Sequence, residues 1–237
     1  MQTILGQIDA GQVLDVATGR GGFIEILVQN LRSFEQITGV DVLSGGAAAF
    51  AEKFQSHSKI HFQQMDAAHL AFPDVCFDTV CISNSLHHLP HPRRALLEML
   101  RVLRPGGQLL LCEMYRDGQT ETQQTHVLLH DWWAAIDMAQ GITHYPTFTR
   151  QQLVGFLEDL PLANLALHDL CDLSDNPLEP SNLADLDQVI DRYIARSQGL
   201  PNAKALQEQG EALRQRVHNL GYHDASALLA IGQKFSV

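Results

Sequence analysis

The sequence predicts a doubly wound α/β fold with a mostly parallel sheet. Over the first 114 residues, short apolar runs alternate with segments of helical periodicity. The runs are apolar throughout, as strands are when helices cover both faces of a parallel sheet. A glycine-rich turn follows the first run, at Ala17–Gly22. Ligands of such sheets bind at the carboxyl ends of the strands, so we expect the functional residues there.

The elements of the first half follow one another in regular order. Five strands are expected, at Gln12–Ala17, Gln36–Asp41, Ile60–Gln64, Val75–Ile82 and Gln108–Met114. Helices are expected at Gly22–Leu31 and Gly45–Gln55. A third helix begins at Pro92, carries its apolar residues on one face, and ends before Pro105-Gly106-Gly107.

The second half is less regular and mostly helical. Helices are expected at Thr120–Ala139, at Thr149–Leu157, from Ser181-Asn182 onward, and at Ala203–Leu220. Two further strands, Leu162–Leu170 and Ala225–Ile231, complete a sheet of seven strands. The last two helices lie between these strands, which indicates an insertion in the sheet's final hairpin. We therefore expect one domain over residues 1–237, with helical insertions at 115–160 and 172–221.

Composition limits the partners and the location. The chain has 237 residues, of which 16 are basic and 27 acidic, giving a net charge of −11. Nucleic acid is a poor partner for such a chain, because phosphate binding draws on Lys and Arg. No run approaches the roughly 18 apolar residues of a membrane span, and residues 1–11 do not resemble a signal peptide. We expect a cytoplasmic protein with a small-molecule substrate and no nucleic-acid or membrane partner.

The four cysteines point to no special chemistry. Cys76, Cys81, Cys112 and Cys171 are scattered, with no C-x-x-C pair. The first three lie in apolar, strand-like runs. This favours buried, reduced thiols over a disulfide framework or a zinc site.

Two features at the ends of the first two strands indicate a nucleoside cofactor. The first is the turn Ala17–Gly22, whose glycines allow a tight backbone turn and the close approach of a ligand. The second is Asp41, which lies 20 residues after Gly21 and can accept hydrogen bonds from both ribose hydroxyls. Nicotinamide dinucleotides use the same two devices, and Ala17-x-Gly19-x-x-Gly22 nearly matches their fingerprint. Taken alone, the two features leave the cofactor open.

Further motifs follow in order along the first half. They are Met65-Asp66-Ala67 after the third strand, Phe72-Pro73-Asp74 and Phe77-Asp78-Thr79-Val80 around the fourth, Ser83-Asn84-Ser85-Leu86-His87-His88-Leu89 after it, and Leu103-Arg104-Pro105-Gly106-Gly107 before the fifth. With them, residues 11–114 strongly resemble the class I S-adenosylmethionine-dependent methyltransferases, which have a Rossmann-like fold. The similarity is greatest to the branch that acts in ubiquinone and menaquinone biosynthesis. It implies S-adenosylmethionine as the cofactor and S-adenosylhomocysteine as its product.

The resemblance also implies a role for each matching position. Asp15 and the turn residues Ala17, Thr18, Gly19 and Gly21 would hold the methionine end of the cofactor. Asp41 would hold the ribose, Val42 would pack on the adenine, and Asp66 and the Ala67 backbone would read the edge of the ring. Ser83 and Asn84 would line the methionine side near the methyl group. Ala17 stands where many relatives have glycine, and we expect binding to survive this one added methyl group.

The cover of the site is expected to come from the second half. Relatives commonly have a helical segment before the first strand that folds over the cofactor, whereas about eleven residues precede it here. Methyl transfer benefits from excluding water and from holding the acceptor in line with the methyl group. The sources of cover are Tyr115–Thr149, Asp172–Gly221, or a partner subunit in a homodimer.

One helical stripe predicts the acceptor side of the site. His126, His130, Trp133 and Asp137 fall on one face of the helix expected at Thr120–Ala139, beside an apolar stripe of Leu129, Trp132 and Ile136 that would seat the helix on the domain. We favour a pocket wall, with Tyr115, His126, Trp133 and His144 contacting the acceptor and His130 as a catalytic group. The alternatives are a half-exposed polar face, or a metal site with His144 or Asp131 as a third ligand. No metal is assigned.

The function that these observations predict is methyl transfer to a small acceptor by in-line displacement. Placement would contribute first, and proton removal second. We expect a structural role for His87, and His88 is a candidate general base. A nicotinamide-dependent oxidoreductase and a non-catalytic S-adenosylmethionine-binding protein are the alternatives, and the ordered motifs favour the methyltransferase over both.

Overall fold

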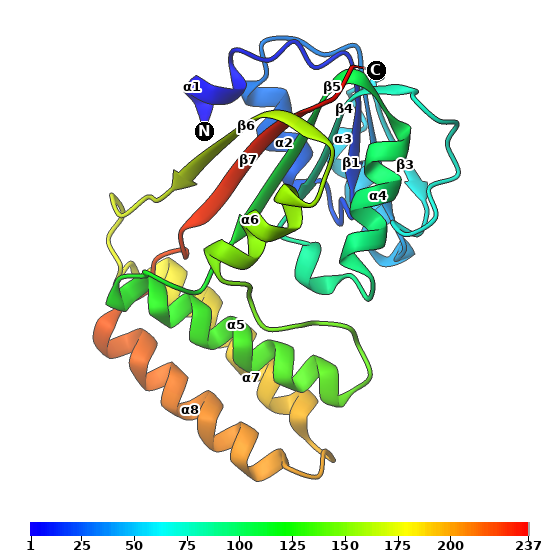
Figure 1. The fold of residues 1–237 in the computed structure, drawn as a ribbon. Coiled ribbons are helices and arrows are strands. Elements are labelled where there is room, and N and C mark those ends of the chain that lie inside the picture. Colours follow the sequence, from blue (N-terminus) through cyan, green and yellow to red (C-terminus); the bar gives the residue numbers. More distant parts are fainter. Residues whose placement is uncertain (237) are drawn as a thin grey trace. The chain divides into compact units, whose positions relative to one another are not determined.

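A seven-stranded sheet organises the chain. The computed structural model describes residues 1–236, and the strand order is β3-β2-β1-β4-β5-β7-β6 (Figure 1). The strands are β1 (Gln12–Val16), β2 (Gln36–Asp41), β3 (Ile60–Gln64), β4 (Phe77–Ser83), β5 (Leu103–Met114), β6 (Leu162–Leu170) and β7 (Ala227–Lys234). The first five run parallel, and the sheet has one antiparallel hairpin. The predicted doubly wound, mostly parallel fold is confirmed.

The strand order reverses at β1, and this fixes where a ligand can bind. β1 pairs with β2 on one side and with β4 on the other. The chain therefore winds outward from β1 to β3, then returns and winds outward from β4 to β5 in the opposite direction. In open α/β sheets, the crevice at the carboxyl ends of the two central strands is the usual ligand site. Residues just after Val16 and Ser83 border it.

Helix α1 (Gln2–Leu5) precedes β1. Three helices connect strands of the first half: α2 (Gly22–Asn30), α3 (Ala47–Phe54) and α4 (Pro92–Val102). Helix α4 buries one stripe, formed by Ala95, Leu96, Met99 and Leu100, and leaves polar residues on its other face. Its Pro92 lies at a first-turn position, where a missing N–H costs no hydrogen bond.

Two expected strands have different starts in the structure. β4 begins at Phe77 rather than Val75, because Val75 has φ +52 and is exposed. β5 begins at Leu103 rather than Gln108: Leu103 pairs with Phe77, and the ladder resumes at Gln108 opposite Thr79. The residues between bulge outward, since Pro105 lacks an N–H for the ladder and Gly106 takes a positive φ of +76. The start of the helix expected at Gly45–Gln55 also moves, because a 3₁₀ turn, Ser44–Gly46, precedes α3.

The chain separates into two compact units. One comprises Met1–Glu113, Val154–His168 and Leu228–Val237, and the other comprises Met114–Leu153 and Asp169–Ala227. The first holds the sheet with its helices. The second holds the helices α5 (Glu121–Ala139), α7 (Pro180–Ser197) and α8 (Ala203–Leu220), while α6 (Arg150–Glu158) begins in the second unit and ends in the first. The functions expected of these regions stay predictions. They are cofactor binding for residues 11–114 and cover of the site for the helical insertions.

The helical unit has its own core. The apolar stripe of α5 packs against α7 and α8. The buried residues of this shared core are Leu129, Trp132, Ile136, Ile190, Leu206, Leu213 and Val217. The indole of Trp132 also donates a 2.9 Å hydrogen bond to the Leu206 carbonyl oxygen. At the start of α5, Thr120 and Gln123 form a reciprocal capping box. The apolar stripe that the sequence placed against the domain therefore builds the helical unit itself.

Candidate functional site

A buried carboxyl group lies at the end of β1. Asp15 is 1% exposed, and its oxygens accept hydrogen bonds from the Thr18 hydroxyl (2.6 Å) and from the thiol of Cys81 on β4 (3.4 Å). Burial raises the pKa of Asp15 to about 7, an effect that the two hydrogen bonds oppose. Asp15 therefore supports the first turn of the site, and its role toward the methionine end of a cofactor stays a prediction.

The raised pKa of Asp15 makes stability depend on pH. The folded chain holds this proton more tightly than the unfolded chain does, so the stability is greatest at low pH. It falls as pH rises from the ordinary Asp pKa near 3.8 through about 7. Asp15→Asn removes this titration. We expect the advantage of the Asn variant in unfolding free energy to grow by about 2 kcal/mol between about pH 5.5 and pH 8.5, as measured by urea denaturation. A constant difference across this range would contradict the assignment.

The turn after β1 depends on left-handed backbone. Ala17, Gly19 and Gly21 have φ of +56, +54 and +77. Thr18 N donates to the Val40 carbonyl oxygen (2.9 Å), which ties the turn to β2. A Cβ added to Gly19 would meet nothing within 4 Å, so the space over this residue is open. A Cβ on Gly21 would lie 2.4 Å from the ring of Phe54, so close packing requires glycine there.

Ala17 carries strain that glycine would relieve. The left-handed conformation costs an L-residue roughly 1–2 kcal/mol. Glycine avoids this cost, but it increases the conformational entropy of the unfolded chain. That increase lowers the unfolding free energy by about 0.4–1 kcal/mol. We expect Ala17→Gly to raise the unfolding free energy by up to about 1 kcal/mol in urea denaturation.

Ala51→Gly, at an exposed position within α3, is the matched control for this prediction. It should lower the unfolding free energy by about 1 kcal/mol, because helical backbone favours alanine. A loss in Ala17→Gly as large as that in the control would contradict the account.

Asp41 joins the ends of β1 and β2. Its Oδ2 accepts a 2.9 Å hydrogen bond from Gly19 N, and its Oδ1 accepts one of 2.8 Å from Leu43 N. Each carboxylate oxygen keeps a lone pair for a further donor. The next side chain, Val42, is 59% exposed, so its apolar surface is accessible just after the end of β2. The structure thus brings the glycine turn and the predicted ribose acceptor into direct contact.

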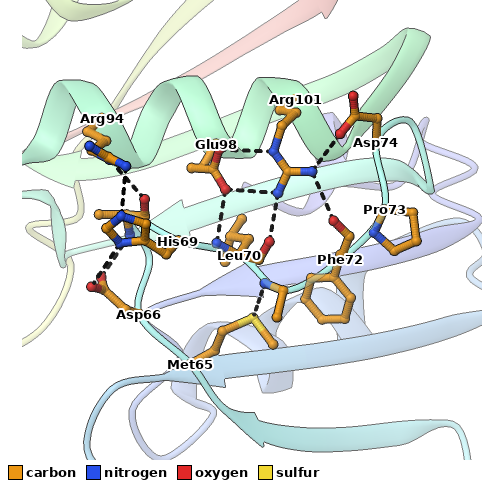
Figure 2. Close-up of polar contacts among 12 residues, drawn as sticks. Met65, Asp66, His69, Leu70, Phe72, Pro73, Asp74, Arg94, Glu98 and Arg101 are labelled. Carbon is orange, nitrogen blue, oxygen red and sulfur yellow. Dashed lines mark hydrogen bonds and ion pairs between the residues drawn. The ribbon is translucent and has the colours of Figure 1, made fainter.

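The third strand adds Asp66 to the same edge of the sheet. Met65 N donates to the Asp41 carbonyl oxygen (2.8 Å), so the chain leaving β3 lies beside the end of β2. Asp66 Oδ1 accepts a 2.8 Å hydrogen bond from Ala68 N, and its Oδ2 faces His69, as Figure 2 shows. Ala67 is buried.

A carboxylate at the end of β5 organises the loop that follows β4. Both oxygens of Glu113 are used: Oε2 accepts from Ser85 N (3.0 Å) and Leu86 N (2.9 Å), and Oε1 lies 2.9 Å from Nδ1 of His87. The Ser85 hydroxyl lies 3.2 Å from the carbonyl oxygen of Ala17 and 2.8 Å from that of Ser83. Asn84 takes a positive φ of +42, and its N–H bonds to Cys112 O. The expected methionine-side residues, Ser83 and Asn84, therefore adjoin the glycine turn.

His87 is the more constrained of the two adjacent histidines. His87 and Glu113 are 2% and 1% exposed, whereas His88 is exposed, and the two rings lie 4.3 Å apart. A carboxylate accepts only, so Nδ1 of His87 carries the proton and Nε2 carries a lone pair. Sequence reasoning missed Glu113 and Ser85. The sequence signal for Glu113 was the presence of one acidic residue within the apolar run Leu109–Met114.

In the helical unit, histidine and carboxylate side chains form a relay. Nδ1 of His144 donates to Asp137 Oδ2 (2.7 Å), so its Nε2 can accept from Nε2 of His130 at 3.2 Å. Asp137 also accepts from Arg196 and from the Tyr193 hydroxyl. Thus His144 lies between His130 and Asp137, two residues of the predicted stripe, in one chain of side-chain contacts.

The remaining predicted acceptor residues lie in the same unit. His126 Nδ1 accepts from Ala225 N (3.0 Å), and burial lowers the pKa of this histidine. Tyr115 is buried, which raises its pKa. Trp133 stacks on Tyr193, with ring centres 5.7 Å apart, and its buried Nε1–H has no acceptor among the described residues. Asp131, the other candidate third ligand, accepts instead from Thr147.

The cysteines agree with the expectation of free thiols. Cys81 and Cys112 are buried in β4 and β5, and burial raises the pKa of Cys112 to about 11. Cys76 is half-buried and Cys171 exposed, and the four are free. High thiol pKa values argue against thiolate chemistry at the two buried positions.

Among the helices of residues 1–236, none is both long enough and apolar enough to cross a bilayer.

Comparison with known proteins finds a family match within the first half. Residues 14–111 match the methyltransferase domain family. A demethylmenaquinone methyltransferase of Clavibacter sepedonicus is 33% identical over 102 residues, which cover 43% of this chain and 40% of that protein. The chain spans less than half the length of the curated relatives that it matches.

Solved structures extend the similarity to the whole fold. A candidate methyltransferase of Bacillus halodurans superposes with a TM-score of 0.63 at 16% identity, covering 99% of this chain and 97% of that one. Phosphoethanolamine N-methyltransferase 2 of Haemonchus contortus, solved with phosphomonomethylethanolamine and S-adenosylhomocysteine, gives 0.56 at 16% identity, covering 95% and 49%. At these identities the likeness concerns the fold, and it confirms the Rossmann-like architecture.

Proposed function

We propose that this chain, which carries a class I methyltransferase domain at residues 14–111, transfers the methyl group of S-adenosylmethionine to a small-molecule acceptor. The observation that carries the proposal is the contact between the glycine turn and Asp41 at the switch point of the sheet. The net charge of −11 supports a small acceptor over a nucleic acid. A cytoplasmic location belongs to the same proposal.

The residues at the strand ends fit an adenosyl group joined to an amino acid. The space over Gly19 is open, Asp41 keeps acceptor capacity for ribose hydroxyls, and Val42 offers an exposed apolar face to a purine. In the proposal, Asp66 and Ala67 meet the adenine edge. The residues placed at the methionine end are Asp15, Ala17, Thr18, Gly19, Gly21, Ser83 and Asn84. When bound, the cofactor supplies a methyl group on a positively charged sulfur.

Proton removal is assigned to His87 rather than to His88. Glu113 fixes the His87 tautomer with the ring proton on Nδ1, and the proposal gives the role of base to Nε2. When bound, the cofactor would supply its methyl carbon to a lone pair of the acceptor, and the bonding pair of the carbon–sulfur bond would stay on sulfur. The acceptor's proton passes to Nε2 of His87. His88 and His130 stay candidates for orienting the acceptor.

The acceptor contacts are assigned to the helical unit. The unsatisfied indole N–H of Trp133 supports this, because a buried donor without a partner is costly and a bound acceptor oxygen would satisfy it. Tyr115, His126 and His144 complete the proposed contacts. A homodimer would add cover to the site.

The test is a screen for methyl uptake. The protein is incubated with methyl-labelled S-adenosylmethionine and a panel of small phenols, quinols, amines and β-keto acids. We expect label to enter one class, with S-adenosylhomocysteine formed in equal amount. A nicotinamide enzyme would instead be stabilised against heat by NADH and not by S-adenosylhomocysteine. A binding protein would be stabilised by S-adenosylhomocysteine but would transfer no label to any acceptor.

A further inference from the structure

The chain between β3 and β4 is held by side chains of a helix instead of by a neighbouring strand. Figure 2 shows this segment, which we call the 65–74 loop, against one face of α4. Alternate residues make the contacts. Arg94 Nε donates to Ala68 O (3.1 Å), Arg101 Nη2 donates to Leu70 O (2.7 Å), and Arg101 Nη1 donates to Phe72 O (2.9 Å). Arg94 and Arg101 thus bond alternate carbonyls, as a strand edge would.

The helix side chains also hold one another in place. Arg94, Glu98 and Arg101 are spaced at i, i+4 and i+7, which places them on one face of α4. Glu98 receives two hydrogen bonds from Arg101, of 2.9 and 2.8 Å, and its Oε2 also accepts from Leu70 N (3.0 Å). Both backbone groups of Leu70 are therefore bonded to α4. The opposite face of α4 is buried in the core of the sheet unit, which fixes the helix that carries these side chains.

The same face reaches Asp66 through a histidine. Arg94 Nη2 lies 2.7 Å from Nε2 of His69, and because arginine only donates, that nitrogen must accept. The ring proton of neutral His69 is therefore on Nδ1, which lies 3.5 Å from Asp66 Oδ2. The other oxygen of Asp66 is held by Ala68 N. Arg94 thus acts on the Asp66 carboxylate by two routes, through His69 and through the Ala68 backbone.

We infer that Arg94, with the Glu98–Arg101 pair, is a positioning residue that sets the specificity of the site for adenine over hypoxanthine. The inference rests on the proposed function, in which Asp66 meets the amino group at position 6 of the purine. A fixed carboxylate accepts from that amino group but opposes the oxygen of hypoxanthine, since both groups are acceptors. A carboxylate free to turn away loses this discrimination.

The experiment compares S-adenosylhomocysteine with S-inosylhomocysteine by calorimetry; the two purines differ in the group at position 6 and in the hydrogen that hypoxanthine carries on N1. The wild type should bind the adenine form at least about tenfold more tightly. Arg94→Gln should reduce that preference at least about fivefold, mainly through weaker binding of the adenine form. Arg94→Lys keeps the charge but offers one donor group in place of two, so we expect an intermediate preference.

Arg93→Gln is the matched control. Arg93 adjoins Arg94 on α4 but pairs with Asp159 and has no hydrogen bond to the 65–74 loop in the structure. The preference of this variant should equal that of the wild type. A wild-type preference that survives unchanged in folded Arg94→Gln overturns the inference and leaves the proposed function intact. A wild-type protein that binds neither compound contradicts the proposed function, and the inference with it.

Discussion

Replacing Glu113 with glutamine is expected to slow methyl transfer by about 10²–10⁴-fold while leaving the affinity for S-adenosylhomocysteine within about twofold of the wild type. The amide oxygen can still accept from Ser85 N and Leu86 N, so the loop after β4 keeps its course. The amide NH₂ then faces Nδ1 of His87, which must become an acceptor. The ring proton moves to Nε2, and the base is lost.

Two measurements check this prediction separately. Labelled methyl uptake reports the rate, and ring ¹⁵N shifts of His87 report the tautomer without any need to know the acceptor. His88→Gln is the matched control, because it removes the neighbouring exposed histidine and leaves the Glu113 contacts in place. A folded Glu113→Gln variant with an unchanged rate, together with a large loss in the control, would move the base to His88.

Replacing Asp41 with alanine is expected to weaken binding of S-adenosylhomocysteine by about 2–3 kcal/mol, which corresponds to roughly 30–150-fold in the dissociation constant. Two effects combine. The ribose loses its acceptor, and Gly19 N and Leu43 N lose the carboxylate that holds the turn beside β2. Asp41→Asn keeps one acceptor oxygen, and we expect a loss of about tenfold.

Asp41→Ala and Asp41→Asn each also remove a negative charge, and a separate variant controls for this effect. Asp9→Asn removes one negative charge from a carboxylate that precedes β1 and bonds to Ser33 and Arg32. Calorimetry should find its affinity equal to that of the wild type. Equal affinity in Asp41→Ala would instead show that the strand ends of β1 and β2 do not bind the ribose.

The sequence predicts the fold well where the pattern is local. β6 and α8 begin and end at the expected residues, and α5 begins directly after the predicted Thr120. The predicted ends of an element are wrong where pairing with a residue far away in the sequence sets them. The four residues between Leu103 and Gln108 look like a helix end followed by a loop, yet Leu103 already pairs with Phe77 on the neighbouring strand. No local pattern contains that pairing.

In the candidate site too, local patterns predict some residues, and contacts between distant segments decide the others. The glycine turn, Asp41 and Asp66 could be placed because each follows a parallel strand, and such ends share one edge of the sheet. Glu113 could not be assigned a role, because its partners lie 26 to 28 residues away and become neighbours only when β4 and β5 pair. The same holds for Arg94 and Arg101, whose spacing alone reads as a solvated helix face.

The central claim is that the carboxyl ends of β1, β2 and β3 bind an adenosyl group joined to an amino acid. Titration of the wild-type chain with S-adenosylhomocysteine in a calorimeter tests it most directly. We expect one site per chain with a dissociation constant in the micromolar range, about −8 kcal/mol, and no comparable heat with NADH. Folded protein that gives no binding heat with S-adenosylhomocysteine, at concentrations up to about 1 mM and at more than one temperature, would contradict the account.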